Sequence, residues 1–192
     1  DKAVAMADAV MAKYPRNPDA LALRGELWLG QPGGRAKAME VYKQAVDIDP
    51  RHVIALANLV SLRLVSGDME GARQAQKQLR LAGPQLIITE QQEGTLAYAA
   101  GDHARAREIF QALLRGLPDN INLLLLGGQN ELKLGSAVQA ETMFSRALAL
   151  QPNSDKARRL LAQAQLALGQ VPRALTTLAP LVDKPDAGPE VL

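Results

Sequence analysis

The side chains that most often carry out chemistry are few in this chain and are not grouped. The two histidines, His52 and His103, stand at no spacing typical of a metal site, and there is no cysteine to act as nucleophile or ligand. The glycine-rich stretch 31–34 (QPGG) lacks the lysine of a phosphate-binding loop. Aspartates and glutamates are dispersed, and no convergent carboxylate pair can be recognised. The sequence therefore predicts a protein that is not an enzyme, with no catalytic residue, cofactor or metal.

Composition indicates a globular, helical chain. Of the 192 residues, 47% are apolar, 22% are charged and only 3% are aromatic, so alanine and leucine, both good helix formers, supply most of the apolar content. No apolar run approaches the ~20 residues that a membrane span needs. The net charge is +2, and basic runs such as 156–159 carry no interleaved aromatic residue. We therefore expect solvated helix faces rather than nucleic-acid binding.

Three residue types recur with one period over the whole chain. Glycines lie 34 residues apart at five positions: Gly33, Gly67, Gly101, Gly135 and Gly169. Alanines follow each glycine five residues later: Ala38, Ala72, Ala106, Ala140 and Ala174. Prolines keep the same period: Pro50, Pro84, Pro118 and Pro152, with Pro15 one residue out of step before them. The apolar spacing between these marks is helical, so the sequence predicts repeated helix hairpins.

Each periodic residue has a physical task in such a hairpin. The glycine ends the first helix and can adopt the left-handed conformation there. Asp68, Asp102 and Ser136 follow it as N-caps of the second helix, and Ser136 with Gln139 forms a capping-box pattern. The alanine lies where the two helices press together, so a bulky residue at Ala106 should cost roughly 1–3 kcal/mol. The proline ends the second helix.

The period divides the chain into repeats. Residues 1–17 hold the second helix of a truncated repeat, and 189–192 open a further one. Five full repeats lie between them, at 18–52, 53–86, 87–120, 121–154 and 155–188. The first is one residue longer, which predicts a longer turn at 31–34. Because neither end carries a polar capping repeat, we expect a piece of a longer protein that forms one continuous solenoid.

This pattern resembles the tetratricopeptide-repeat (TPR) family. Repeat 121–154 carries the motif residues Leu124, Gly128, Gly135, Ala140, Phe144, Ala147 and Pro152. Repeat 18–52 carries Leu21, Gly25, Trp28, Ala38, Tyr42, Ala45 and Pro50, and repeat 87–120 carries Gly94, Gly101, Ala106, Phe110 and Pro118. Two repeats depart from this motif. Repeat 53–86 has Val60 in place of the first glycine and Gln76 in place of the second aromatic residue, and repeat 155–188 has Ala162 and Leu178 at these positions. The resemblance implies an all-α, right-handed superhelical solenoid of stacked antiparallel helix hairpins.

A narrower resemblance concerns stretches such as 20–27 (ALALRGEL), 156–162 (KARRLLA) and 175–181 (LTTLAPL). They are similar to the TPR lipoprotein of bacterial exosortase (PEP-CTERM) systems. That family implies an envelope assembly linked to exopolysaccharide production and protein sorting. It also implies a periplasmic or outer-membrane location through a lipid anchor upstream of this chain. The cytoplasm remains the alternative.

The TPR resemblance also implies where a partner binds, because first helices of the repeats line a concave groove in that family. The polar residues at the groove-facing positions are Asn58, Ser61, Gln91, Gln92, Thr95, Tyr98, Asn122, Gln129, Lys133, Lys156, Arg159 and Gln163. Amides and hydroxyls can bond the backbone of an extended peptide, and positive charge gathers toward the C-terminal repeats. The Lys/Asn/Asn/Lys/Arg clamp for a chaperone tail is not matched.

Three other residues have structural interpretations. Asn130 lies in an otherwise apolar stretch and, if buried, needs a partner such as a carbonyl of a neighbouring helix. Trp28 and Tyr42 are expected to pack between the helices of one hairpin rather than to hold a cofactor.

Three hypotheses about function follow. The first is a scaffold that binds a protein or peptide in the groove. The second is a structural spacer that positions a catalytic or transport domain elsewhere in a longer chain. The third is self-association through uncapped ends.

Overall fold

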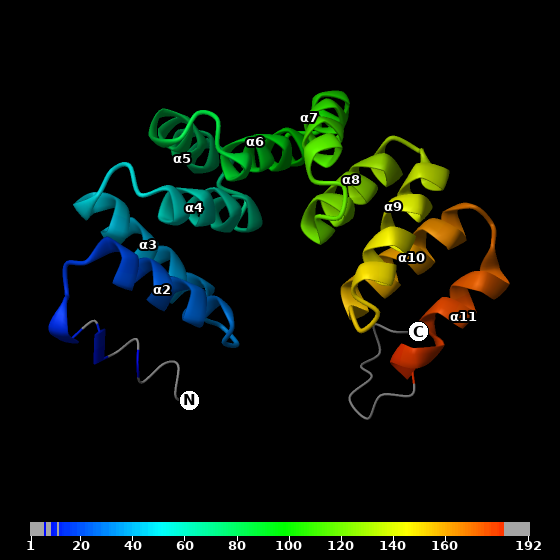
Figure 1. The fold of residues 1–192 in the computed structure, drawn as a ribbon, viewed down its shortest axis with the longest axis horizontal. Helices are drawn as coiled ribbons and strands as arrows, with labels where there is room; N and C mark the ends of the chain where they lie inside the picture. Colours follow the sequence, from blue (N-terminus) through cyan, green and yellow to red (C-terminus); the bar gives the residue numbers. More distant parts are fainter. Residues whose placement is uncertain (1–5, 7–8, 11, 183–192) are drawn as a thin grey trace. The chain divides into compact units, whose positions relative to one another are not determined.

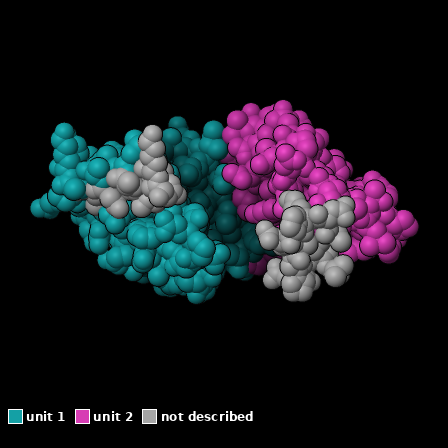
Figure 2. Space-filling model, turned by 90° about the horizontal axis from the view of Figure 1, so that it is seen from below, with its two compact units in different colours: residues 1–100 teal, residues 101–192 magenta. Residues whose placement is uncertain are grey.

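The computed structural model describes residues 6, 9–10 and 12–182, and within these residues it contains ten labelled helices and no strand. The chain divides into two compact units, residues 1–100 and 101–192 (Figure 2). The all-α fold is thereby confirmed. The predicted helix within 1–17 lies partly outside the described residues, and the predicted opening of a repeat at 189–192 lies wholly outside them.

Unit 1 contains two helix hairpins and a fifth helix (Figure 1). These are α2 (Pro18–Leu29) with α3 (Arg35–Ile48), α4 (Val53–Val65) with α5 (Met69–Ala82), and α6 (Ile87–Ala99). α3 packs on α4, and α6 packs on both α4 and α5. The largest core cluster joins Leu21, Tyr42, Leu59 and Val60, so the two hairpins share one interior.

Unit 2 begins with the single helix α7 (His103–Gly116) and continues with two hairpins (Figure 1). These are α8 (Ile121–Lys133) with α9 (Ala137–Leu150), and α10 (Asp155–Ala167) with α11 (Val171–Val182). α7 packs on α8, and α10 packs on α9 and α8. The core runs from Leu124 and Phe144 to Ala157 and Leu161. The boundary between the units falls inside the predicted repeat 87–120, so continuity of the solenoid stays a prediction.

The periodic residues adopt the conformations that the sequence predicts. Every glycine of the set has a positive φ, between 72° and 80°, and no other described residue does. All five alanines are buried, at 0–1% exposure. The turn between α2 and α3 spans residues 30–34, against three residues in the other hairpins. The longer turn is confirmed, and a Cβ on Gly34 would lie 1.8 Å from the Trp28 carbonyl oxygen, so this position requires glycine.

The three residues predicted as N-caps all occupy N-cap positions, but only two of them cap with their side chains. Asp68 accepts a hydrogen bond from the Gly71 N–H at 2.8 Å, and Asp102 accepts one from the Arg105 N–H at 3.1 Å. Ser136 occupies the N-cap position of α9, but its side chain bonds no backbone N–H of that helix, so the predicted capping box does not form. Its hydroxyl instead accepts a hydrogen bond from Arg107 Nη2 at 2.8 Å.

Candidate functional site

The polar side chains predicted to contact a partner in unit 1 come from α4 and α6, which pack side by side. Asn58, Ser61, Gln91, Thr95 and Tyr98 are partly exposed. Asn58 donates its amide N–H to the Ile54 carbonyl at 3.0 Å, and the Thr95 hydroxyl donates to the Gln91 carbonyl at 2.9 Å. After these bonds Asn58 keeps one amide N–H and its carbonyl oxygen, and Thr95 keeps its hydroxyl oxygen as an acceptor.

Gln92 differs from its neighbours because it is buried, at 7% exposure. Its Nε2 donates to the Ser61 hydroxyl at 2.9 Å and so ties α6 to α4. Its Oε1 is buried without a hydrogen-bond partner among the described residues. Gln92 therefore positions Ser61 rather than facing solvent, contrary to the expectation of a surface contact.

The second half of the predicted set lies on α8 and α10 of unit 2. Its members are Asn122, Lys133, Lys156, Arg159 and Gln163, which are exposed, and Gln129, which is partly exposed. Gln129 donates its amide N–H to the Leu125 carbonyl at 3.0 Å, which repeats the geometry of Asn58. The two helices together carry four basic and two acidic side chains, so this surface is net positive.

A buried polar cluster joins α7 to α8 beneath that surface. Asn130, fully buried, donates its Nδ2 to the His103 carbonyl at 2.9 Å, and its Oδ1 lies 3.0 Å from His103 Nδ1. The predicted carbonyl partner on a neighbouring helix is thus confirmed. One residue further on, the Glu131 carboxylate is bound by both Nε and Nη2 of Arg107, and this pairing raises the pKa of Arg107. These contacts fix neighbouring helices.

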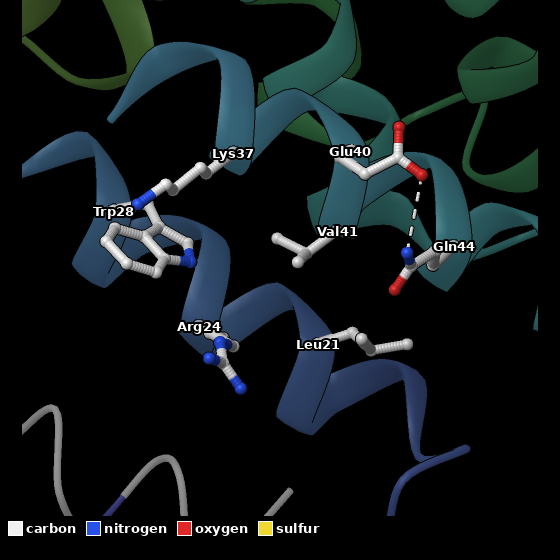
Figure 3. A pocket seen from close by; sticks show the side chains of 7 residues that line it. All are labelled: Leu21, Arg24, Trp28, Lys37, Glu40, Val41 and Gln44. Carbon is white, nitrogen blue, oxygen red and sulfur yellow. Dashed lines mark hydrogen bonds between the residues drawn. The ribbon is translucent and has the colours of Figure 1, made fainter. Parts of the chain in front are cut away.

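The first hairpin carries a pocket that was not predicted from the sequence. It has a volume of about 310 Å³ between α2 and α3 and is lined by Leu21, Arg24, Trp28, Lys37, Glu40, Val41 and Gln44 (Figure 3). The Lys37 ammonium lies 4.2 Å from the centre of the Trp28 ring, and the Arg24 guanidinium lies 6.0 Å from it. Trp28 therefore packs only partly into the hairpin, whereas Tyr42 is fully buried as expected.

The comparisons with known proteins bear on the fold and on part of the sequence. Residues 131–192 match the family model described as "Tetratricopeptide repeat". A tetratricopeptide repeat protein from Parabacteroides merdae superposes with a TM-score of 0.81 at 16% identity, over 99% of this chain and 74% of that one. This chain has the tetratricopeptide-repeat fold. The predicted resemblance is thereby confirmed, and no curated protein matches the chain in sequence.

Two further TPR-like structures show how this fold occurs in different settings. A thermophilic TPR protein of Thermus thermophilus, TTC0263, has a TM-score of 0.77 at 21% identity, over 91% of this chain and 94% of that one. The "APC/C hetero-tetramer Cut9-Hcn1" has a TM-score of 0.80 at 16% identity, over 93% of this chain and 35% of that one. Proteins of this fold generally mediate protein–protein interaction and bind protein or peptide partners.

The described part of the chain offers little for other kinds of site. It contains no group of three or more histidine, cysteine, aspartate or glutamate side chains placed to hold a metal ion. Across residues 12–182, no helix has the length and apolar character that crossing a bilayer requires.

Proposed function

We propose that this chain is a scaffold that binds a protein or peptide segment on its first-helix surface. This surface is defined as the partly or fully exposed members of the predicted set: Asn58, Ser61, Gln91, Thr95 and Tyr98 in unit 1, and Asn122, Gln129, Lys133, Lys156, Arg159 and Gln163 in unit 2. The observation that supports this most directly is the repeated amide geometry. Asn58 and Gln129 each donate one amide N–H to the carbonyl four residues earlier in the same helix, at 3.0 Å, which orients each amide. An oriented amide oxygen on each unit suits an N–H group of an extended backbone.

The two parts of the surface differ in charge, which suggests what each part binds. α4 and α6 present mainly amides and hydroxyls, whereas Lys133, Lys156 and Arg159 are exposed on α8 and α10. Neutral polar residues of a partner complement the part in unit 1, and acidic residues complement the part in unit 2. We further propose a bacterial envelope assembly as the setting, which rests on the narrower resemblance alone. No catalytic step is proposed.

The test is an affinity capture from bacterial envelope extract, read by mass spectrometry. The surface variant replaces four first-helix side chains by alanine: Gln91, Tyr98, Gln129 and Arg159. A matched control replaces four exposed side chains of the second helices by alanine: Lys43, Lys77, Gln111 and Gln139. No hydrogen bond or ion pair of these four side chains is found within the described residues. Circular dichroism verifies that both variants keep the helical content of the wild type.

The expected result is a partner that the wild type and the control retain and the surface variant loses. Recovery of the same partners by all three proteins would overturn the proposal and favour a structural spacer. Loss of the partner from both variants alike would also count against the first-helix surface, because the binding would then not distinguish one face of the helices from the other.

A further inference from the structure

We propose that the place where the turn between α3 and α4 meets the end of α5 is a second binding site. Its ligand is an extended peptide segment that carries an aspartate or glutamate two residues away from an aliphatic side chain. The site is a pocket of about 370 Å³, lined by Pro50 and Arg51 of the turn and by Gln78 and Leu81 of α5, and we name it the Arg51 corner. It shares no residue with the first-helix surface, so the two sites can be tested independently.

The Arg51 corner is open to solvent, because all four residues that line it are exposed. Leu81 has the most exposed large apolar side chain in the described part of the chain, at 71%. Together with the Pro50 ring it forms the apolar side of the pocket. An aliphatic side chain of a ligand that covers Leu81 removes apolar area of both molecules from water, which favours binding.

The guanidinium of Arg51 supplies the charge of the site. Its Nη2 donates to the Leu81 carbonyl at 3.5 Å, a long hydrogen bond that places the cation beside Leu81. This bond uses one of five N–H groups, and its acceptor is neutral. Among the described residues no ion pair involves the Arg51 side chain, and the neighbouring Asp49 carboxylate accepts the backbone N–H of Arg51 at 3.0 Å. A carboxylate of a ligand can therefore bind the guanidinium without displacing another one.

The corresponding corner of unit 2 contains an ion pair. Asp119 stands at the turn position of Arg51, and Arg146 of α9 stands at the position of Gln78. Arg146 Nη2 lies 2.7 Å from Asp119 Oδ1, so this corner accommodates a carboxylate and a guanidinium in contact. The other two turns have neutral residues at the position of Arg51, namely Gln85 and Asn153. Because Gln78 is also neutral, the Arg51 corner lacks the internal counter-charge that unit 2 has, and an acidic ligand supplies it.

The size of the Arg51 corner indicates how the two ligand side chains are spaced. Side chains two residues apart point to the same side of an extended segment and lie about 6.6 Å apart along it. The Arg51 guanidinium contacts the backbone of Leu81 itself, so such a pair can reach the cation and the leucine together. A volume of about 370 Å³ is at the small end for ligand sites and suits two side chains rather than a large cofactor.

Heteronuclear NMR reports on this site directly, because the side-chain amide of Gln78 and the Nε–H of Arg51 each give a signal of their own. The probe is a capped peptide, Gly-Glu-Ser-Leu-Gly, titrated into the isotope-labelled full chain. We expect saturable shifts of both signals with a dissociation constant of about 1 mM, as a small peptide contact allows. Replacing the glutamate of the probe by glutamine, or its leucine by serine, should weaken binding about fivefold.

Variants of the turn locate the binding. Arg51→Gln should weaken binding of the probe about five- to tenfold. Arg35→Gln, the same substitution at another exposed arginine of unit 1, should leave binding unchanged. Arg51→Glu should reverse the preference, so that a probe with lysine in place of glutamate binds more tightly than the original probe. Circular dichroism verifies that each variant keeps the helical content of the wild type.

The four-alanine surface variant should bind the probe like the wild type, which separates this site from the proposed function. Absence of a saturable shift of the Gln78 signal up to about 20 mM probe would overturn the proposal. Equal effects of Arg51→Gln and Arg35→Gln would also overturn it. So would an unchanged preference for the glutamate probe in Arg51→Glu, because the contact would then not depend on the charge of Arg51.

Discussion

The Tyr42 hydroxyl lies inside the first hairpin without a hydrogen-bond partner among the described residues, and we predict that its removal stabilises the protein. Tyr42 is fully buried, and its hydroxyl oxygen has no partner among the described residues. The corresponding positions in two other repeats are Phe110 and Phe144, which are also buried. We therefore expect Tyr42→Phe to stabilise the protein, although it removes a polar group from a natural sequence.

The magnitude follows from the burial of that hydroxyl. A buried hydroxyl without a partner costs about 1–3 kcal/mol, and the ring that remains in Tyr42→Phe keeps the same packing against Gly25. We expect a gain of about 1 kcal/mol in the free energy of unfolding, measured by urea denaturation followed by circular dichroism at neutral pH. The reverse change, Phe144→Tyr, places a new hydroxyl in an equivalent site and should destabilise by about 1–3 kcal/mol.

The pH dependence gives the same variant a second signature. Burial, and to a smaller extent the negative charge of Glu26, raises the pKa of Tyr42 above its ordinary value of 10.0. The folded state therefore keeps the phenol proton at a pH where the unfolded state loses it. The contribution of the Tyr42 phenol to the free energy of unfolding is fully present below about pH 10 and falls by about 1.4 kcal/mol per pH unit above it. The advantage of Tyr42→Phe over the wild type should widen between about pH 10 and pH 11.5.

Two results would refute this reasoning. If Tyr42→Phe destabilised the protein at neutral pH, the hydroxyl would have a partner, such as an enclosed water, and would not be an unmet polar group. If the stability difference between wild type and Tyr42→Phe stayed constant across the alkaline range, the phenol would not be desolvated in the folded state.

Three further predictions concern the residues that shape the repeats. Arg107→Met leaves the carboxylate of Glu131, whose side chain is 3% exposed, without its charge partner; because Arg107 itself is 35% exposed, we expect a loss of about 2–3 kcal/mol in urea denaturation. Gly135→Ala should lower the free energy of unfolding by about 1–2 kcal/mol because φ at Gly135 is 73°. Gly116→Ala is the control, because Gly116 lies at a helix end with open space around the added Cβ; it should be neutral or stabilise by up to about 0.5 kcal/mol in the same assay. Asp68→Ala removes the cap on the Gly71 N–H and should lower stability by about 1 kcal/mol, with a smaller effect for Asp68→Ser if the cap is the cause.

Much of the fold could be predicted because its determinants are local and periodic. A left-handed glycine and a buried alanine recur at fixed spacing, and each follows from backbone sterics or from close helix contact within one hairpin. The errors arise where partners come from another helix. Ser136 and Gln139 form a valid local capping pattern, but Arg107, 29 residues earlier in the chain, takes the serine hydroxyl. Gln92 was expected on a surface, and its bond to Ser61, 31 residues away, buries it.

The candidate sites were predictable only in part for the same reason. The exposed positions on the first helices could be predicted from the repeat register, because the resemblance to the TPR family indicates which positions face the groove. The Trp28 pocket needs two helices at once, since Lys37 of α3 reaches the ring of α2. One signal was present in the sequence: Arg24 lies one turn before Trp28 on the same helical face, which places a cation beside the ring.

The departures from the repeat pattern also follow one steric rule. A Cβ on Gly25 would lie 2.5 Å from the Tyr42 ring, and a Cβ on Gly128 would lie 2.5 Å from the Phe144 ring, so each ring requires the glycine opposite it. In repeats 53–86 and 155–188 the ring is absent, with Gln76 and Leu178 in its place, and the glycine is replaced by Val60 and Ala162. Val60 and Ala162 are buried, at 0% and 1% exposure, so they fill volume that a ring would otherwise occupy. The substitutions within one repeat are therefore coupled through packing, and the fold tolerates them as pairs because the space between the two helices stays filled.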